Sequence, residues 1–510
     1  MKTQLMSLVL FMYSFGLLGQ PANMLWQNSL GGSGNEYAYK IFQTPDNGFI
    51  VMGHSESNDG DVSENKGNMD YWLVKLNEAG ELEWERSYGG SGYEFGYSVI
   101  NTIDGGYLLG GQSGSADGDV SNNHGMNDAW VVKLDGVGNI QWEKSYGGSL
   151  NEYITGMIET TDGGFLFVAP TTSGDGDITN NQGELDYWII KTDPQGTIEW
   201  QKTYGGSESD YSQDVKQTVD GGYIVTGMSR SSDGDITNPY GGYDYWVLKL
   251  DPMGNMEWQK NYGGSQDDFS LAILVTDDNG YIISGYSKSN NGDVSGNHGG
   301  NDYWIIKIDG SGNLQWQKSY GGSDDDLASY ITKSNTGGYI ISGLTFSDDG
   351  DITNNHGERD AWILETDASG NLIWQGCYGG SDIDLANFVV PTLDGNYTFA
   401  GYSRSNDGDV SGNHGMHDFW VFKLEGTLSV DEYTAKNIII YPNPVQGSLH
   451  FLSEIPIIEI SISNLQGQEV YYKKNSRMSS VNLENLSNGI YILTAKLPEG
   501  KKITQKFIKQ

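Results

Sequence analysis

The sequence predicts an all-β protein in which a seven-bladed β-propeller is followed by a small, immunoglobulin-like (Ig-like) C-terminal β-sandwich. Three observations lead to this fold class. A unit of 58 residues recurs seven times without insertion or deletion, and each unit holds four strand-sized apolar segments. Both the repeat and the tryptophans then stop before the C-terminal 74 residues, which predicts a separate domain there.

Tryptophan marks the period of the repeat. All 14 tryptophans fall into two series with a step of 58 residues. The first series is Trp26, Trp84, Trp142, Trp200, Trp258, Trp316 and Trp374, and the second is Trp72, Trp130, Trp188, Trp246, Trp304, Trp362 and Trp420. A fixed period of this length indicates an array of equivalent supersecondary units.

Each unit contains four predicted strands separated by turn signals. In the fifth unit we expect them near Phe269–Val275, Tyr281–Tyr286, Tyr303–Ile308 and Asn313–Tyr320. Segments such as YWIIKI are apolar on both alternating faces, which is typical of strands covered on both sides. Four strands in each of seven units predict a propeller over residues 24–426, with a linear β-solenoid as the alternative.

The two ends of the repeat region favour a closed ring. The first tryptophan strand, at residues 25–32, has no partner strand before it, and the last apolar strand, at residues 418–426, has none after it. We therefore expect the N-terminal strand to supply the outer strand of the seventh blade. Closure of this kind also removes the exposed strand edges that invite aggregation.

The N-terminus and the charge restrict where the protein acts. Residues 1–20 carry a lysine at position 2 and then a short apolar run, which predicts a secretory signal peptide, and no later stretch has the length and apolarity of a membrane span. The net charge of −38 argues against nucleic acid or anionic membranes as partners. Cys377 is the single cysteine, so an intrachain disulfide is excluded.

Composition changes after the last repeat. Residues 427–436 form a predicted linker, and residues 437–510 hold eight Lys or Arg against five Glu, a net of +3. The rest of the chain therefore carries about −41. Short alternating segments with turn signals predict a small β-sandwich over residues 437–510.

Both regions resemble known bacterial families. The stretch DYWIIKIDGSGNLQWQKSYGGSDDD followed by GGYIISG resembles the bacterial β-propeller repeats of the SBBP type, which implies a propeller for residues 24–426. The elements YPNP, NLxGQ and NGIY and the final basic strand are similar to the type A C-terminal sorting domain of type IX secretion. This resemblance implies that the type IX machinery recognises residues 437–510, removes them near the linker, and leaves the protein secreted or on the outer cell surface.

One loop of each unit carries alternating acids. In the first unit Asp59, Asp61 and Asp70 occupy positions 1, 3 and 12, which suits a loop that binds Ca²⁺ through oxygen ligands. The candidate calcium ligands are Asp59, Asp61, Asp70, Asp117, Asp119, Asp128, Asp175, Asp177, Asp186, Asp233, Asp235, Asp244, Asp293, Asp302, Asp349, Asp351, Asp360, Asp407, Asp409 and Asp418. Position 6 is mostly not glycine and position 12 is the short aspartate, so a metal-free network of Asx turns is the favoured alternative. No other cofactor is predicted.

Other repeated side chains have structural interpretations. The loop histidines are predicted to be solvated, and the acids after each GGS turn, from Glu36 to Asp384, are too alike to be the two distinct carboxylates of a glycosidase. Glu365 replaces a repeated lysine and is interpreted as local drift. The clearest variation lies at the end of the second strand, at His54, Gln112, Pro170, Met228, Tyr286, Leu344 and Tyr402.

These features predict a secreted or cell-surface binding or adhesion protein that recognises an unidentified protein or glycan through the acidic loop face. The first alternative is a secreted enzyme acting on polysaccharide, a propeller glycosidase or lyase. The near-identity of the blades argues against an enzyme, because an active site needs residues that break the symmetry, and no catalytic residue is predicted. A purely structural surface component is the other alternative.

Overall fold

The computed structural model describes residues 20–426 and 439–509, except 442–443, 453–456, 465–467, 475–479, 485 and 497–501. Residues 1–19 of the predicted signal peptide and the predicted linker lie outside the described residues. The chain forms two compact units, Met1–Leu428 and Ser429–Gln510. In the described parts, no helix has the length and apolarity needed to cross a bilayer.

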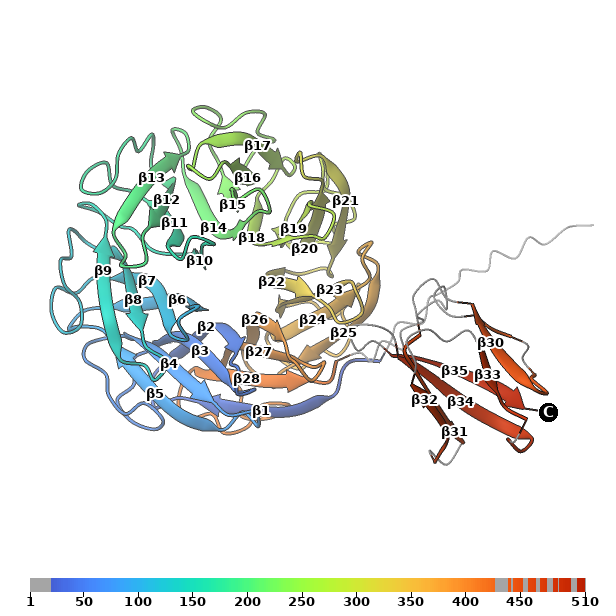
Figure 1. The fold of residues 1–510 in the computed structure, drawn as a ribbon. Coiled ribbons are helices and arrows are strands. Elements are labelled where there is room, and N and C mark those ends of the chain that lie inside the picture. Colours follow the sequence, from blue (N-terminus) through green and yellow to red (C-terminus); the bar gives the residue numbers. More distant parts are fainter. Residues whose placement is uncertain are drawn as a thin grey trace, which may run out of the picture. The chain divides into compact units, whose positions relative to one another are not determined.

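The first unit is a ring of seven four-stranded antiparallel sheets around a central channel (Figure 1). The innermost strands are β2 (Glu36–Gln43), β6 (Glu94–Asn101), β10 (Gly156–Glu159), β14 (Asp210–Gln217), β18 (Asp268–Val275), β22 (Asp326–Lys333) and β26 (Asp384–Pro391). The second strands are β3 (Phe49–Ser55), β7 (Tyr107–Ser113), β11 (Phe165–Thr171), β15 (Tyr223–Ser229), β19 (Tyr281–Ser287), β23 (Tyr339–Thr345) and β27 (Tyr397–Ser403).

The two outer positions of each blade complete the sheets. The third strands are β4 (Asp70–Leu76), β8 (Asp128–Leu134), β12 (Asp186–Thr192), β16 (Asp244–Leu250), β20 (Asp302–Ile308), β24 (Asp360–Thr366) and β28 (Asp418–Leu424). The outermost strands are β5 (Leu82–Tyr88), β9 (Ile140–Tyr146), β13 (Ile198–Tyr204), β17 (Met256–Tyr262), β21 (Leu314–Tyr320), β25 (Leu372–Tyr378) and β1 (Met24–Leu30).

The N-terminal strand closes the ring. β1 pairs antiparallel with β28, with Gln27 opposite Phe422 and Ser29 opposite Trp420, and so becomes the outermost strand of the seventh blade. The predicted all-β propeller and its mode of closure are thereby confirmed. The linear solenoid is excluded, because each of the seven sheets stands between two neighbours in the ring.

The third strands form the core between blades, and all seven are buried along their whole length. At the junction of the first two blades the rings of Tyr71 and Trp130 lie 4.7 Å apart, and the Tyr71 hydroxyl donates to the Trp130 carbonyl at 2.9 Å. The same pair recurs as Tyr245 and Trp304. Since burying a large apolar side chain contributes roughly 1.5–3 kcal/mol, this repeated contact is a principal stabiliser of the ring.

The innermost strands carry a feature that shapes the channel. Six of them have a β-bulge at the same repeat position, as between Ala38 and Lys40 in β2. A bulge inserts one unpaired residue and turns neighbouring side chains toward the same side. In the third blade β10 is only four residues long. Pro170 of β11 occupies the repeat position at which the second strand of other blades pairs with the start of the innermost strand, as His54 does with Tyr37. Proline has no N–H to donate to that ladder.

The second unit consists of two antiparallel sheets that form a sandwich. One sheet contains β29 (Ile439–Tyr441), β30 (Ser448–Leu452) and β33 (Ser480–Asn482). The other contains β32 (Glu469–Lys474), β31 (Glu459–Asn464), β34 (Gly489–Lys496) and β35 (Lys502–Lys509). Side chains from both sheets, including Leu449, Ile460, Leu493 and Phe507, share one buried core.

Candidate functional site

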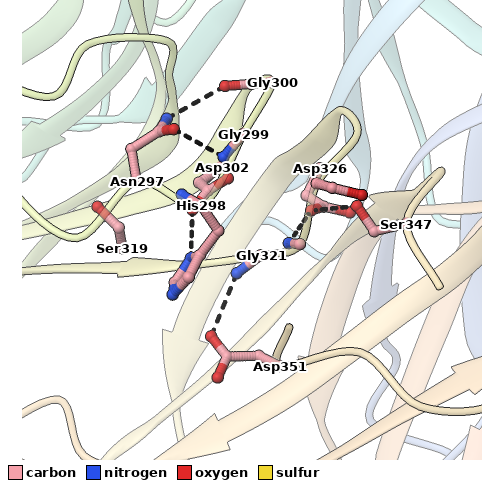
Figure 2. A network of polar contacts seen from close by, with 12 residues as sticks. Asn297, His298, Gly299, Gly300, Asp302, Ser319, Gly321, Asp326, Ser347 and Asp351 are labelled. Carbon is pink, nitrogen blue, oxygen red and sulfur yellow. Dashed lines mark hydrogen bonds and ion pairs between the residues drawn. The ribbon is translucent and has the colours of Figure 1, made fainter. Parts of the chain in front are cut away.

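The acidic loops pack against the glycine loops that lead into the same blade. In the sixth blade, Asp349 Oδ1 accepts the N–H of Ser323 at 2.7 Å. Asp351 Oδ2 accepts the N–H of Gly321 at 3.3 Å (Figure 2). The Asp351 N–H in turn donates to the Gly321 carbonyl at 3.0 Å. The first contact recurs in every blade, from Ser33 onward, with the amide oxygen of Asn291 as the acceptor in the fifth blade. Both loop sets therefore lie on one face of the propeller, which is called the loop face below.

The third acid of each loop is buried at the junction with the next blade. Asp302 Oδ2 accepts the His298 N–H at 2.9 Å and lies 2.7 Å from the His298 ring Nδ1 (Figure 2). Its other oxygen, Oδ1, is buried and has no hydrogen-bond partner. The same is true of the equivalent oxygen in every blade, at Asp70, Asp128, Asp186, Asp244, Asp360 and Asp418.

The acid after each GGS turn stabilises that turn, as the sequence analysis favours. Asp326 is fully buried, and its Oδ2 accepts the Gly322 N–H at 2.7 Å and the Ser347 hydroxyl at 2.9 Å. Its Oδ1 accepts the Thr345 hydroxyl. These carboxylates have no access to a substrate, so a ring of catalytic acids is excluded at this position.

The predicted calcium ligands are thus divided among separate tasks. The first two acids of a loop hold the glycine loop, while the third lies at the blade junction and holds its own loop. Within the described residues, no three His, Cys, Asp or Glu side chains are grouped so that they could hold a metal ion. Calcium binding by these loops stays a prediction.

The first glycine of the GGS turn fits between two buried carboxylates. A Cβ built on Gly147 would stand 2.7 Å from Glu152 Oε2 and 2.9 Å from Asp128 Oδ1. Distances this short leave no room for a side chain, which explains a glycine at this position in every unit.

The same packing brings an acid of one blade against an acid of the next. Burial, together with repulsion from Asp210, raises the pKa of Asp186 to about 7.

The repeat position occupied by the loop histidines lies beside carboxylates of the loop face. His124, His298, His356 and His414 each contact the buried aspartate four residues later at 2.7–2.8 Å. Where the histidine is replaced, Lys66 pairs with Asp119 of the next blade, and Gln182 donates to Asp235 of the next blade at 2.8 Å. The four histidine side chains are exposed, as predicted for solvated loop residues, and each also contacts a buried carboxylate.

The central channel holds a cavity of about 430 Å³, within the range of about 300–1,000 Å³ typical of small-molecule sites. Its lining comes from the bulged region of the innermost strands. At the bulge residue the seven blades carry Tyr39, Tyr97, Thr155, Gln213, Leu271, Ser329 and Asn387. At the following residue they carry Lys40, Ser98, Gly156, Asp214, Ala272, Tyr330 and Phe388. The repeat is therefore broken in the channel, while the strands around it stay nearly identical.

Aromatic side chains occupy two arcs of the channel wall. On one arc, the Tyr39 and Tyr97 rings meet edge to face at 5.2 Å, and the Tyr97 and Tyr153 rings lie 6.0 Å apart. On another arc, the rings of Tyr330 and Phe388 stack at 3.6 Å. Burial raises the pKa of Tyr97 to about 12, so this hydroxyl stays protonated at physiological pH.

Charged groups in the channel are few and mostly paired. Asp214 is buried, lies 2.6 Å from the Lys216 ammonium, and accepts the Ile273 N–H at 3.1 Å. The Lys40 ammonium donates to the Ser98 hydroxyl at 3.0 Å and lies 5.5 Å from the centre of the Phe388 ring. Burial lowers the pKa of Lys40 to about 8, so this lysine is close to half-charged in mildly alkaline conditions.

An aromatic collar lies between the loop face and the cavity. It consists of Tyr37, Phe95, Tyr153, Tyr211 and Phe269, completed by Leu327 and Leu385. In six blades its members pair across the sheet with the variable residues at the end of the second strand, as Tyr37 does with His54 and Phe269 with Tyr286. The variable positions that the sequence analysis singles out thus lie behind the collar.

The cavity residues themselves are missed by the sequence analysis. They fall in the innermost strand, between the acid that follows the GGS turn and the next glycine turn, at positions 37–43 of the first unit, for which the repeat has little consensus. The sequence signal that could have found these residues is the loss of consensus inside a strand. A position that varies between otherwise nearly identical blades is one whose residue is not determined by packing.

Comparisons with known proteins support the two-part organisation. Residues 439–510 match the model of the secretion system C-terminal sorting domain. A curated relative, the regulatory protein FlaEY of Caulobacter vibrioides, is 22% identical over 419 residues. The match covers 73% of this chain and 43% of FlaEY, so the chain spans less than half the length of that relative.

Several solved structures are similar at low identity. PorZ, a surface component of the type IX secretion system of Porphyromonas gingivalis, is 10% identical with a TM-score of 0.40, over 94% of this chain and 60% of PorZ. Sqt1 from Chaetomium thermophilum is 10% identical with a TM-score of 0.39, over 77% and 88%. A puromycin hydrolase is 10% identical with a TM-score of 0.42, over 92% and 62%. Residues 439–510 of this β-propeller protein therefore carry the type IX sorting signal, which directs its export to the cell surface or the medium.

Proposed function

We propose that the exported propeller is a binding or adhesion protein without catalytic activity, and that its ligand approaches the loop face and enters the central channel. The observation that carries the proposal is the loss of the repeat in the channel lining, where the residue at the bulge position and the residue after it differ from blade to blade. A purely structural ring needs no such variation, since seven equal blades would close equally well.

The chemistry of the channel supports binding over catalysis. Among the described residues that line the cavity, Asp214 is the one carboxylate, and it is already paired with Lys216. Glycoside hydrolysis generally uses two carboxyl groups about 5–9.5 Å apart, one acting as acid and one as nucleophile or base. The repeated acids of the loop face are buried or hydrogen-bonded to backbone N–H groups, and so support the scaffold.

The test is a combined binding and turnover screen of the secreted protein on glycan and protein arrays. We expect saturable binding of at least one ligand, which is recovered chemically unchanged after prolonged incubation. Conversion of the bound ligand to product would contradict the proposal. Absence of binding across both arrays would favour a purely structural component instead.

A further inference from the structure

The channel lining suggests what kind of molecule is bound, and this inference rests on the proposed binding function. We propose that the cavity in the central channel binds a neutral saccharide. The relevant features are the flat aromatic faces, the polar side chains between them and the sign of the surrounding charge.

The aromatic arcs provide stacking surfaces. Tyr39, Tyr97, Tyr330 and Phe388 line the cavity and are half-buried, so parts of their rings remain accessible from the channel. A sugar ring has an apolar face of C–H groups and an edge of hydroxyls, and it suits a site in which aromatic rings alternate with hydrogen-bonding groups. The aromatic collar continues this surface toward the loop face, where a longer chain could pass.

Neutral polar groups line the cavity beside the aromatic rings. Gln213, Ser329, Asn387 and Thr155 come from four different blades. Asn387 uses its amide N–H to hold the Ala38 carbonyl at 2.8 Å, which fixes the direction of its side chain. Within the described residues, the side chains of Gln213 and Ser329 make no hydrogen bond, and both remain available to hydroxyl groups of a ligand. An apolar ligand would leave these groups unsatisfied, at a cost in free energy.

The charge of the molecule selects against anionic ligands. The part of the chain before residue 437 carries about −41 charges, and a field of this sign repels anions at long range. Inside the cavity, Asp214 and Lys216 neutralise one another, so Lys40 is the single unpaired cationic group among the lining residues. A neutral saccharide is not repelled by the negative field of the molecule, and it needs no cationic groups in the cavity to balance a charge of its own.

The experiment is isothermal titration calorimetry of the full chain with neutral gluco- and manno-oligosaccharides of two to six units, and with oligogalacturonates as the anionic counterpart. We expect saturable binding of a neutral series and no measurable binding of the anionic one. Gln213→Ala and Tyr97→Ala are expected to weaken binding at least tenfold while the unfolding temperature stays close to that of the parent. Tyr240→Ala, on the loop face and outside the cavity, is the matched control and should leave the affinity unchanged.

The outcomes separate this inference from the proposed function. No binding of any neutral series at millimolar concentration, or binding that both channel variants leave intact, would overturn the saccharide assignment. A protein ligand found on the arrays would still uphold the binding function in that case. Hydrolysis of a bound oligosaccharide would instead overturn the non-catalytic function and leave the assignment of the ligand class standing.

Discussion

At the scale of single residues, the aspartates at the blade junctions are placed where water cannot solvate their charge. Burial raises the pKa of Asp244 to about 7 and that of Asp70 to about 6, and an acid of the next blade adds repulsion in both cases. The turn aspartates behave in the opposite way. Hydrogen bonds from Thr276 and Lys307 lower the pKa of Asp278 to about 2. The same protein thus contains acids shifted in both directions.

These shifts predict a stability maximum at mildly acidic pH. An acid whose pKa is raised on folding binds more protons in the folded than in the unfolded state at any pH between its unfolded pKa, about 3.9, and its folded pKa. Stability therefore falls as pH rises from about 4 to about 7 and then levels off. The turn aspartates contribute stability that is present above about pH 4 and lost as pH falls toward 2. We expect the unfolding temperature, measured by calorimetry across pH 2–9, to peak near pH 4–5.

Asp186→Asn tests the assignment to the junction aspartates. The amide keeps an acceptor for the Gln182 N–H and replaces the unpartnered oxygen with a donor that faces Asp210. We expect this variant to be more stable at pH 8 by about 1 kcal/mol, the size of one buried hydrogen bond. Its fall in stability between pH 5 and pH 7 should also be shallower. If the dependence of stability on pH is unchanged in the variant, the fall in stability between pH 5 and pH 7 arises from the surface charge of the molecule and not from Asp186.

At the scale of elements, the sixth blade shows how two changes compensate. In six blades a lysine of the third strand pairs with an aspartate of the first turn, as Lys307 does with Asp278 at 3.0 Å. In the sixth blade both members differ. Glu365 accepts the Thr336 hydroxyl at 2.7 Å and the Trp374 indole N–H at 2.6 Å. The interpretation of Glu365 as local drift is therefore wrong, because its partner changes with it.

A double-mutant cycle tests this exchange. Glu365→Lys alone places a buried ammonium beside the indole N–H of Trp374, with no carboxylate to pair with it. We expect a loss of about 3–5 kcal/mol in the free energy of unfolding. Adding Thr336→Asp restores the pair found in the other blades and should recover most of that loss. Chemical denaturation of the two single variants and the double variant measures the coupling. Additive effects, with no recovery, would contradict a compensating exchange.

The strands were predictable from the sequence because seven copies of one pattern average out local ambiguity. The 58-residue period, the apolar third strand and the glycine turns all reflect packing that each blade repeats. The bulges in the innermost strands were not predictable, since every unit has a residue at that position whether or not its strand bulges there, and the period is therefore unchanged. For the same reason the sequence placed Lys40 and Asp214 in a strand without indicating that they line the channel.

At the scale of the whole molecule, symmetry separates scaffold from site. The acidic loops are a strong pattern in the sequence, and the spacing of their acids predicts either calcium ligands or, as the favoured alternative, a metal-free network of Asx turns. In the structure those acids bond to backbone N–H groups of neighbouring loops, as Asp349 does to Ser323. Binding specificity in a ring of equal blades must come from residues that differ between blades. Such residues carry the weakest pattern in the sequence, and only the closed ring brings seven of them to one cavity.

Closure of the ring by β1 is the property on which the channel depends, and it can be tested by removing that strand. Deleting residues 24–30 leaves the β28 edge unpaired, although Trp420 and Phe422 keep their places in the blade. We expect a loss of at least about 3 kcal/mol in stability, fast hydrogen exchange along β28, and self-association through the exposed edge. Inserting residues 24–32 directly after residue 426 in the deleted protein should restore slow exchange and the monomeric state. The inserted strand then follows β28 in the chain and can pair with it as a hairpin. If β28 stays protected in the deleted protein, the seventh blade is stable with three strands and the ring does not rely on its N-terminal strand.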